Sequence, residues 1–223
     1  PIEGFTILTF PGVPSEMKAM WVETAHEYIK NKFSDNYSFF SNTIKLSGIG
    51  ESSVAENIND LLNLKNPTVA PYANLGEMKL RITARAKNDL DAQNIIKPVK
   101  EKLKKKFSRF IFGEDHDTLP GILIKELAKR KETIVFAESC TGGLLSSSIT
   151  SISGSSQVFK GSIVSYSNEL KNSLLNISEE KLTKYGAVSE EVCEAMAINV
   201  KEKLEADWAI AISGIAGPNG GSQ

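Results

Sequence analysis

A serine beside a glycine-rich turn is the first feature of this 223-residue chain that could do chemistry. Ser139 follows a β-branched and aromatic run, residues 133–136, and precedes Gly142 and Gly143. The run predicts a buried strand and residues 144–150 predict a helix, so backbone N–H groups and the helix dipole would converge at the turn. The serine hydroxyl could act there as a nucleophile, and the amides could bind an anion or a developing oxyanion. A tight turn made only for packing would have the same pattern.

A serine nucleophile needs a base, and no histidine is near Ser139 in the sequence. Lys171 falls in the first turns of a helix expected after a Ser167-Asn168 cap. Burial and the positive end of a helix both disfavour the charged form of lysine, which would allow the neutral amine to act as a base. Tyr166 could relay a proton or hold the lysine in place. The alternative for Lys171 is a solvated lysine on an amphipathic helix.

Two other kinds of site fail at this turn. Cys140 is a rival nucleophile, but Ser146 stands where a cysteine phosphatase loop has its arginine, so we interpret Cys140 as a packing residue. No Gly-Lys-Ser/Thr follows the glycines, which excludes a nucleoside-triphosphate P-loop. Cys193 is interpreted as structural.

The elements around these residues predict an α/β domain. Strands are expected at residues 133–136, 161–166 and 209–212, and the last runs into a second glycine-rich turn at 213–221. Open α/β sheets bind ligands at the carboxyl ends of their strands, so both turns should lie at one site. Four connecting helices are expected: one at residues 119–131, one that starts near residue 169, one that ends at Gly186, and one from Ser189 to about 204.

Composition limits the class of protein. With 41% hydrophobic and 24% charged residues the chain is ordinary globular material, and its net charge of -1 argues against a strongly basic nucleic-acid binder. Two cysteines are too few for a disulfide scaffold. No apolar run approaches the roughly 18 residues of a membrane span, and no signal peptide is visible. We therefore expect a cytoplasmic protein with no membrane partner.

The chain starts at Pro1 without methionine, and we expect it to be a fragment cut at both ends.

The first half predicts two further parts, residues 1–40 and 41–114, ahead of the α/β domain at 115–223. In the first part we expect a strand at 5–10, a proline-glycine loop, and a helix capped by Ser15. The second part is predicted to be mixed α and β, with a polar break at 113–118 marking the boundary. Its expected strands are 43–46, 78–84 and 110–112, and its expected helices are 52–62 and 90–107.

Residues 10–21, F-PGVPSEMKAMW, resemble the end of the molybdopterin-binding-like domain of the competence/damage-inducible protein CinA family. In that family the domain is similar to a metal-dependent ADP-ribose pyrophosphatase, so a divalent metal is implied only for the part that this chain lacks. Glu16 is either a remnant of that site or a solvated glutamate in a first helical turn. The resemblance also implies a KH-like module at 41–114. Its Gly48-Ile49-Gly50-Glu51 departs from a GXXG clamp between helices, so we expect no nucleic-acid partner.

The resemblance is strongest from residue 119 onward, where AESCTGG, GSSQVFKGSIVSYSNELK, YGAVSEEV and SGIAGPNGG look like the C-terminal domain of the CinA family, also found alone as nicotinamide-nucleotide amidase. That resemblance implies hydrolysis of nicotinamide mononucleotide (NMN) to nicotinate mononucleotide and ammonia, as part of pyridine nucleotide salvage. Ser139 would be the nucleophile and Tyr166 and Lys171 its partners, with no cofactor or metal. An arginine that the family places downstream lies beyond Gln223.

The two turns are expected to bind the mononucleotide, with its phosphate against backbone amides. The expected substrate-binding residues are Glu138, Cys140, Thr141, Gly142, Gly143, Asn168, Ser213, Gly214, Gly217, Gly220 and Gly221. A homo-oligomer is expected, and this fragment itself is expected to be nearly inactive. Two alternatives remain open: a competence or DNA-damage adaptor that binds nucleic acid or a recombination protein, and ADP-ribose pyrophosphatase activity from an intact N-terminal domain.

Overall fold

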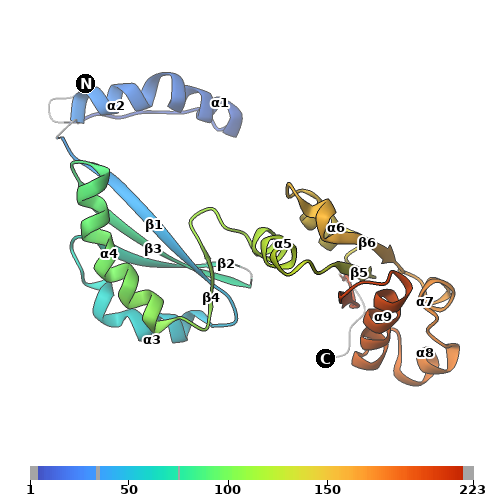
Figure 1. Ribbon diagram of the computed structural model, residues 1–223. Coiled ribbons are helices and arrows are strands. Elements are labelled where there is room, and N and C mark those ends of the chain that lie inside the picture. Colours follow the sequence, from blue (N-terminus) through green and yellow to red (C-terminus); the bar gives the residue numbers. More distant parts are fainter. Residues whose placement is uncertain (1–4, 34–35, 75, 218–223) are drawn as a thin grey trace. The chain divides into compact units, whose positions relative to one another are not determined.

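The computed structural model describes residues 5–33, 36–74 and 76–217. The chain divides into two compact units, Pro1–Asp115 and His116–Gln223 (Figure 1). Each unit contains its own β-sheet, so the chain is a mixed α/β protein as predicted.

The first unit begins with a helical segment made of α1 (Pro14–Met20), the π-helical η1 (Trp21–Ala25) and α2 (His26–Phe33). The predicted cap was wrong, because Pro14 occupies the first turn and Val13 stands at the N-cap without a side-chain bond. The strand predicted at residues 5–10 was also wrong. Those residues pair with no strand among the described residues, and residues 6–10 line a pocket with helical residues such as Tyr28.

An antiparallel sheet of order β2-β3-β1-β4 forms the rest of this unit. Its strands are β1 (Ser38–Leu46), β2 (Thr68–Asn74), β3 (Glu77–Ala86) and β4 (Ile111–Glu114). Three of the four were predicted, but β2 was missed because Pro71 interrupts its pattern. A proline is tolerated there since β2 is an edge strand. Gly113 pairs with Lys45 of β1, so the polar break begins at Asp115 and not at Gly113.

Helices α3 (Glu51–Leu62) and α4 (Asp89–Lys106) cover one face of this sheet (Figure 1). Alternate residues of β3 point toward them: Leu80, Ile82 and Ala84 are fully buried. Asn88 caps α4 by accepting a hydrogen bond from the N–H of Asp91. The strand predicted at residues 78–84 is therefore confirmed.

The second unit is built on a parallel sheet of order β6-β5-β7. Its strands are β5 (Ile134–Glu138), β6 (Phe159–Val164) and β7 (Trp208–Ile212). Its helices are α5 (Leu119–Arg130), α6 (Leu144–Thr150), α7 (Asn168–Leu175), α8 (Glu179–Tyr185) and α9 (Glu190–Lys203), and a short turn of 3-10 helix, η2, spans Ser155–Gln157. The caps predicted at Ser167 and Ser189 are confirmed. Because all strands run parallel, their carboxyl ends lie at one edge.

The central strand β5 is buried on both faces. Ile134 and Phe136 pack into a cluster with residues of α5 and α6, whereas Val135 and Ala137 pack into a cluster with residues of α7 and α9. A strand held from both sides is a rigid support for the residue that follows it, Ser139.

Candidate active site

The predicted turns meet because the sheet pairing continues past the ends of the strands. The N–H of Ser139 donates to the carbonyl of Ile212, 3.0 Å away, and the N–H of Ser165 donates to the carbonyl of Glu138 at 2.8 Å. These bonds place the segment after β5 between those that follow β6 and β7. The predicted grouping of residues from separate strand ends is thus present in the structure.

Ser139 and Lys171 form a buried pair. Lys171 Nζ lies 2.9 Å from Ser139 Oγ, and the two residues are 1% and 5% exposed, respectively. Lys171 Nζ also lies 2.9 Å from the carbonyl oxygen of Ser165 and 3.2 Å from that of Tyr166. The lysine reaches the serine from the first turn of α7, where its own N–H bonds to the carbonyl of the Ser167 cap.

The surroundings of Lys171 favour its neutral form. Burial lowers the pKa of the Lys171 amine, and the nearby Cys140 thiol opposes this effect only in part. A neutral amine has two N–H donors and one lone pair. The carbonyls of Ser165 and Tyr166 can take both N–H groups, which leaves the lone pair facing the hydroxyl of Ser139. This is the arrangement that a general base requires.

Tyr166 contributes differently from the prediction. Its side chain is 68% exposed, and its phenol makes no hydrogen bond among the described residues. The backbone carbonyl is the group that contacts Lys171. The structure thus supports the holding role suggested for this residue, but through the main chain, and the phenol is free to face an incoming ligand.

Glu138 fills the anion site that the sequence assigned to a ligand. Its fully buried carboxylate accepts hydrogen bonds from the N–H groups of Gly143 (3.1 Å), Leu145 (3.0 Å) and Ser146 (2.9 Å), and from the hydroxyl of Ser146. Burial raises the pKa of Glu138, but the hydrogen bonds from Ser146 and its neighbours outweigh burial, so the net shift is downward and the group is ionised.

The Glu138 carboxylate thus caps the start of α6, and this revises two expectations about substrate binding. Glu138 has no exposed surface with which to contact a ligand. The phosphate contact expected at Gly142 and Gly143 does not fit either, because the N–H of Gly143 is bound to Glu138 and that of Gly142 donates to the carbonyl of Ser139 at 3.1 Å. The sequence pattern of an acid before a Gly-Gly helix start could have suggested such an internal cap.

The second turn lies against the first. A Cβ atom on Gly214 would lie 3.1 Å from Cys140 Sγ, so the two turns are in contact. Ser213 Oγ donates to the carbonyl of Ala187 at 2.8 Å, which fixes the start of this turn. Gly217 has a positive φ of 73°, as a tight turn requires. The predicted residues Gly220 and Gly221 lie outside the described residues.

The remaining predicted binding residues differ in accessibility. Asn168 is the first residue of α7 and is exposed beside Tyr166. The Thr141 hydroxyl is buried and forms no hydrogen bond, although it is near enough to Glu138 to lower the pKa of that carboxyl group. Contact of Asn168, Thr141 or the second turn with substrate stays a prediction.

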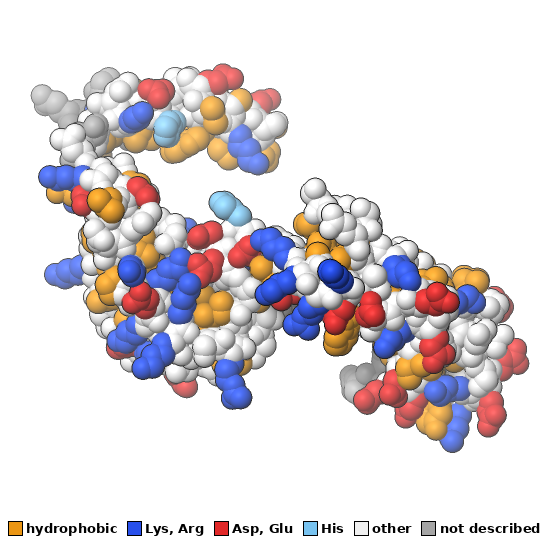
Figure 2. Space-filling model, viewed as in Figure 1, with side chains coloured by type: hydrophobic (Ala, Val, Ile, Leu, Met, Phe, Trp, Pro, Cys, Tyr) orange, Lys and Arg blue, Asp and Glu red, His pale blue; other side chains and the backbone are white. Residues whose placement is uncertain are grey.

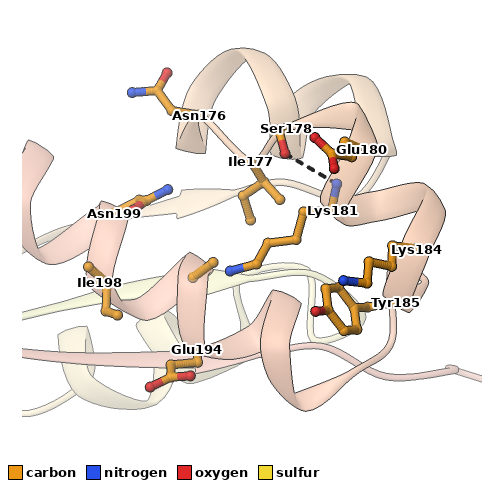
Figure 3. Close-up of a pocket in the computed structure, with 11 residues that line it drawn as sticks. Asn176, Ile177, Ser178, Glu180, Lys181, Lys184, Tyr185, Glu194, Ile198 and Asn199 are labelled. Carbon is orange, nitrogen blue, oxygen red and sulfur yellow. Dashed lines mark hydrogen bonds between the residues drawn. The ribbon is translucent and has the colours of Figure 1, made fainter.

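A pocket elsewhere in the described part of the second unit offers no comparable chemistry. A pocket of about 500 Å³ is lined by residues of α8, α9 and the segment before α8 (Figure 3). Lys181 and Lys184 share it with Glu180 and Glu194, and it contains none of the predicted site residues.

No group of three or more His, Cys, Asp or Glu side chains suited to a metal occurs within residues 5–33, 36–74 and 76–217. None of the helices described is both long and apolar enough to cross a membrane.

Four of the six lysines of α4 pair with two acids of their own unit. Lys102 and Lys106 bind Asp60, lowering the pKa of that carboxyl group to about 2, while Lys100 and Lys104 bind Glu114. In the face shown in Figure 2, basic and acidic side chains are interspersed over this unit. The two carboxylates offset part of the charge of these four lysines, and the absence of a nucleic-acid partner stays a prediction.

The fold and the site together define a mixed α/β protein with a buried serine–lysine pair at the carboxyl ends of parallel strands. Two family models match the chain: CinA C-terminal domain over residues 116–223, and Damage-inducible protein CinA KH domain over residues 41–113. The chain therefore belongs to the CinA family, as its motifs predicted.

Two curated relatives agree with this assignment. A CinA-like protein of Prochlorococcus marinus (strain MIT 9215) is 85% identical over 223 residues, which cover 100% of this chain and 53% of that protein. A CinA-like protein of Gloeothece citriformis (strain PCC 7424) is 49% identical over 222 residues, with 100% and 53% coverage. The chain thus spans about half the length of the curated relatives it matches. Among solved structures, the competence/damage inducible protein CihA from Agrobacterium tumefaciens has 39% identity and a TM-score of 0.46, covering 47% of this chain and 63% of that chain.

Proposed function

We propose that this protein is a serine amidohydrolase that converts NMN to nicotinate mononucleotide and ammonia. The single observation that carries the proposal is the 2.9 Å contact between Ser139 Oγ and the buried amine of Lys171. Burying a lysine is energetically unfavourable unless its amine is fully paired, and buried ionisable groups of this kind are typical of functional sites. The third partner of the Lys171 amine is the hydroxyl of Ser139, at the start of the glycine-rich turn. The identity of the substrate rests on the resemblance of the motifs to the amidase.

The proposed reaction proceeds in two halves. Neutral Lys171 takes the proton of Ser139 as Oγ attacks the carboxamide carbon, giving a tetrahedral intermediate with a negatively charged oxygen. Lys171 then returns that proton to the amide nitrogen, the C–N bond breaks, and ammonia leaves an ester on Ser139. Water next attacks the ester with Lys171 again accepting a proton, and the C–O bond to Ser139 breaks. Nicotinate mononucleotide departs and the serine recovers its proton.

The charge of the substrate favours this use of lysine. NMN carries a positively charged pyridinium ring next to its carboxamide, so a second cation beside the reacting carbon would be repelled. A bound pyridinium therefore favours the neutral form of Lys171 beyond the effect of burial. The proposed mechanism does not require a histidine base, and no described histidine is hydrogen-bonded to Ser139 or Lys171.

The test is release of ammonia from NMN by the purified full-length protein. Ser139→Ala should lower turnover by roughly 10⁴-fold or more while leaving substrate binding intact, because only the nucleophile is removed. Ser147→Ala is the matched control: this exposed serine lies on α6, and its replacement should leave turnover unchanged.

Two outcomes would contradict the proposal. One is wild-type protein that releases no ammonia from NMN. The other is loss of activity in Cys140→Ser combined with retained activity in Ser139→Ala, which would make the neighbouring thiol the nucleophile. An adaptor role would be supported by the first outcome if the same preparation bound nucleic acid.

A further inference from the structure

Backbone amides around Ser139 are nearly all engaged. The N–H of Ser139 donates to Ile212, that of Gly142 to Ser139, and that of Leu144 to Thr141. The N–H groups of Gly143, Leu145 and Ser146 donate to the Glu138 carboxylate. The whole start of α6 is therefore satisfied from within the chain.

Two consecutive amides are left over. The N–H groups of Cys140 and Thr141 have no acceptor among the described residues. Both belong to the central residues of the β-turn that the Gly142 N–H closes onto the Ser139 carbonyl at 3.1 Å. Such a turn uses neither of its central N–H groups internally. Cys140 and Thr141 are half-buried and directly follow the buried Ser139, so their two free N–H groups are available to a ligand at the serine.

We propose that the N–H groups of Cys140 and Thr141 form the oxyanion hole of this enzyme. The inference rests on the proposed function, because it takes Ser139 as the nucleophile. Where a nucleophile sits between a strand and a helix, the N–H of the residue that follows it is a suitable donor to the oxyanion. Successive N–H groups in a turn also form a concavity that binds an anion. The carboxamide oxygen of the substrate becomes that anion when Ser139 attacks.

Glu138 makes this assignment specific. A negative charge already occupies the N-terminus of α6, so an oxyanion would be repelled there, and within residues 139–146 the free donors are the N–H groups of Cys140 and Thr141. The contact between Cys140 Sγ and Gly214 supports the turn from the other side. The amides are thus fixed before the reaction, which is the condition for effective electrostatic stabilisation of a transition state.

The test replaces single backbone amides by esters in the full-length protein, using the α-hydroxy acid analogues of cysteine at 140 and of threonine at 141. Each ester removes one N–H and keeps the side chain. We expect kcat for NMN to fall by about 10²- to 10³-fold for each donor, with KM changed little. The matched control is the α-hydroxy acid analogue at Ser147, whose N–H donates to Gly143 within α6 at 2.9 Å. That ester should leave kcat within a few-fold of wild type.

A second measurement does not depend on the folding of the ester variants. 3-Pyridylboronic acid should add to Ser139 Oγ and form a tetrahedral boronate whose oxygen mimics the oxyanion. Its addition should shift the amide ¹H and ¹⁵N signals of Cys140 and Thr141 in the wild type and not in Ser139→Ala. Shifts confined to the turn at 213–217, or esters that keep kcat within a few-fold while Ser139→Ala is inactive, would overturn the oxyanion hole and leave the nucleophile in place. Activity in Ser139→Ala would instead overturn the proposed function.

Discussion

At the scale of single residues, the feature to be explained is a lysine that is 1% exposed. Burying an ammonium group without a counter-charge is strongly unfavourable, and none of the described carboxylates bonds to Lys171. The neutral amine avoids that cost, and the carbonyls of Ser165 and Tyr166 satisfy both of its N–H groups. The position therefore suits a base much better than a cation.

This protonation state predicts a pH dependence. A lysine in water titrates near about 10.4, and burial moves the pKa of Lys171 below that value. Since the neutral form is the active one, kcat should rise with pH through the folded-state pKa and then level off. Lys171→Arg carries a charge at every working pH, so its activity should fall nearly as far as that of Ser139→Ala. The measurement is the pH–rate profile of both proteins with NMN.

The double variant is the control for this prediction. Ser139→Ala combined with Lys171→Arg should be little worse than either single variant, because the two residues act in one step. Near-normal turnover by Lys171→Arg would show that the lysine only positions the substrate. The base would then have to be sought elsewhere, with the Tyr166 phenol as the first candidate.

The sequence identified the serine and the lysine but not what surrounds them. Ser139 and Lys171 could be paired through the motifs, because each lies at a predicted strand end or helix start. The two carbonyls that orient the amine belong to the backbone and have no residue-type signature. Glu138 was expected to bind substrate as part of the first glycine-rich turn, whereas its carboxylate accepts hydrogen bonds from the start of α6.

At the scale of elements, the site depends on the contact between two turns. The turn after β5 and the turn after β7 approach so closely that only the absent side chain of Gly214 leaves room for Cys140 Sγ. Sequence patterns located both turns and their strands. They could not give this contact, because the contact arises from the pairing of β5 with β7 over residues distant in the chain.

Gly214→Ala should therefore disturb the site. The added Cβ would lie 3.1 Å from Cys140 Sγ, which is too close for an ordinary packing contact. We expect a loss of about 1 kcal/mol or more in the free energy of unfolding, as for other overpacked sites, and reduced turnover of NMN. Urea unfolding of the full-length protein measures the first effect. Cys140→Ala placed in the same chain should restore much of the stability, whereas an equal loss with and without that second change would exclude the contact as the cause.

At the scale of the whole molecule, the hydrophobic clusters do not mix the two units. The fully buried cluster that includes Ile44 and Phe107 draws only on the first unit, and the clusters around Phe136 and Met196 draw only on the second. Composition and patterning anticipated a boundary near Asp115, since polar residues accumulate there. They misplaced its start, because the pairing of Gly113 with β1 is a tertiary feature.

Separate cores predict separate folding. Residues 36–115, expressed alone, should give a dispersed amide NMR spectrum and a cooperative urea transition, because their core is complete without the second unit. The midpoint should match that of the same residues in the full-length protein, followed through their amide signals. An unfolded isolated module would show that its stability depends on the rest of the chain.

The carboxylate of Glu138 has a consequence for the way such glycine turns are recognised across proteins. A strand followed by two glycines and a helix is a pattern typical of a phosphate-binding loop. In this chain the amides at the helix start are already bound by the carboxylate of Glu138, one residue before Ser139. An internal acid of this kind occupies the amides that would otherwise bind an anion at the helix start, so under the proposed function free phosphate would not compete with the substrate at these amides. Searches for nucleotide-binding loops could use an acid at that position as a reason to reject a match.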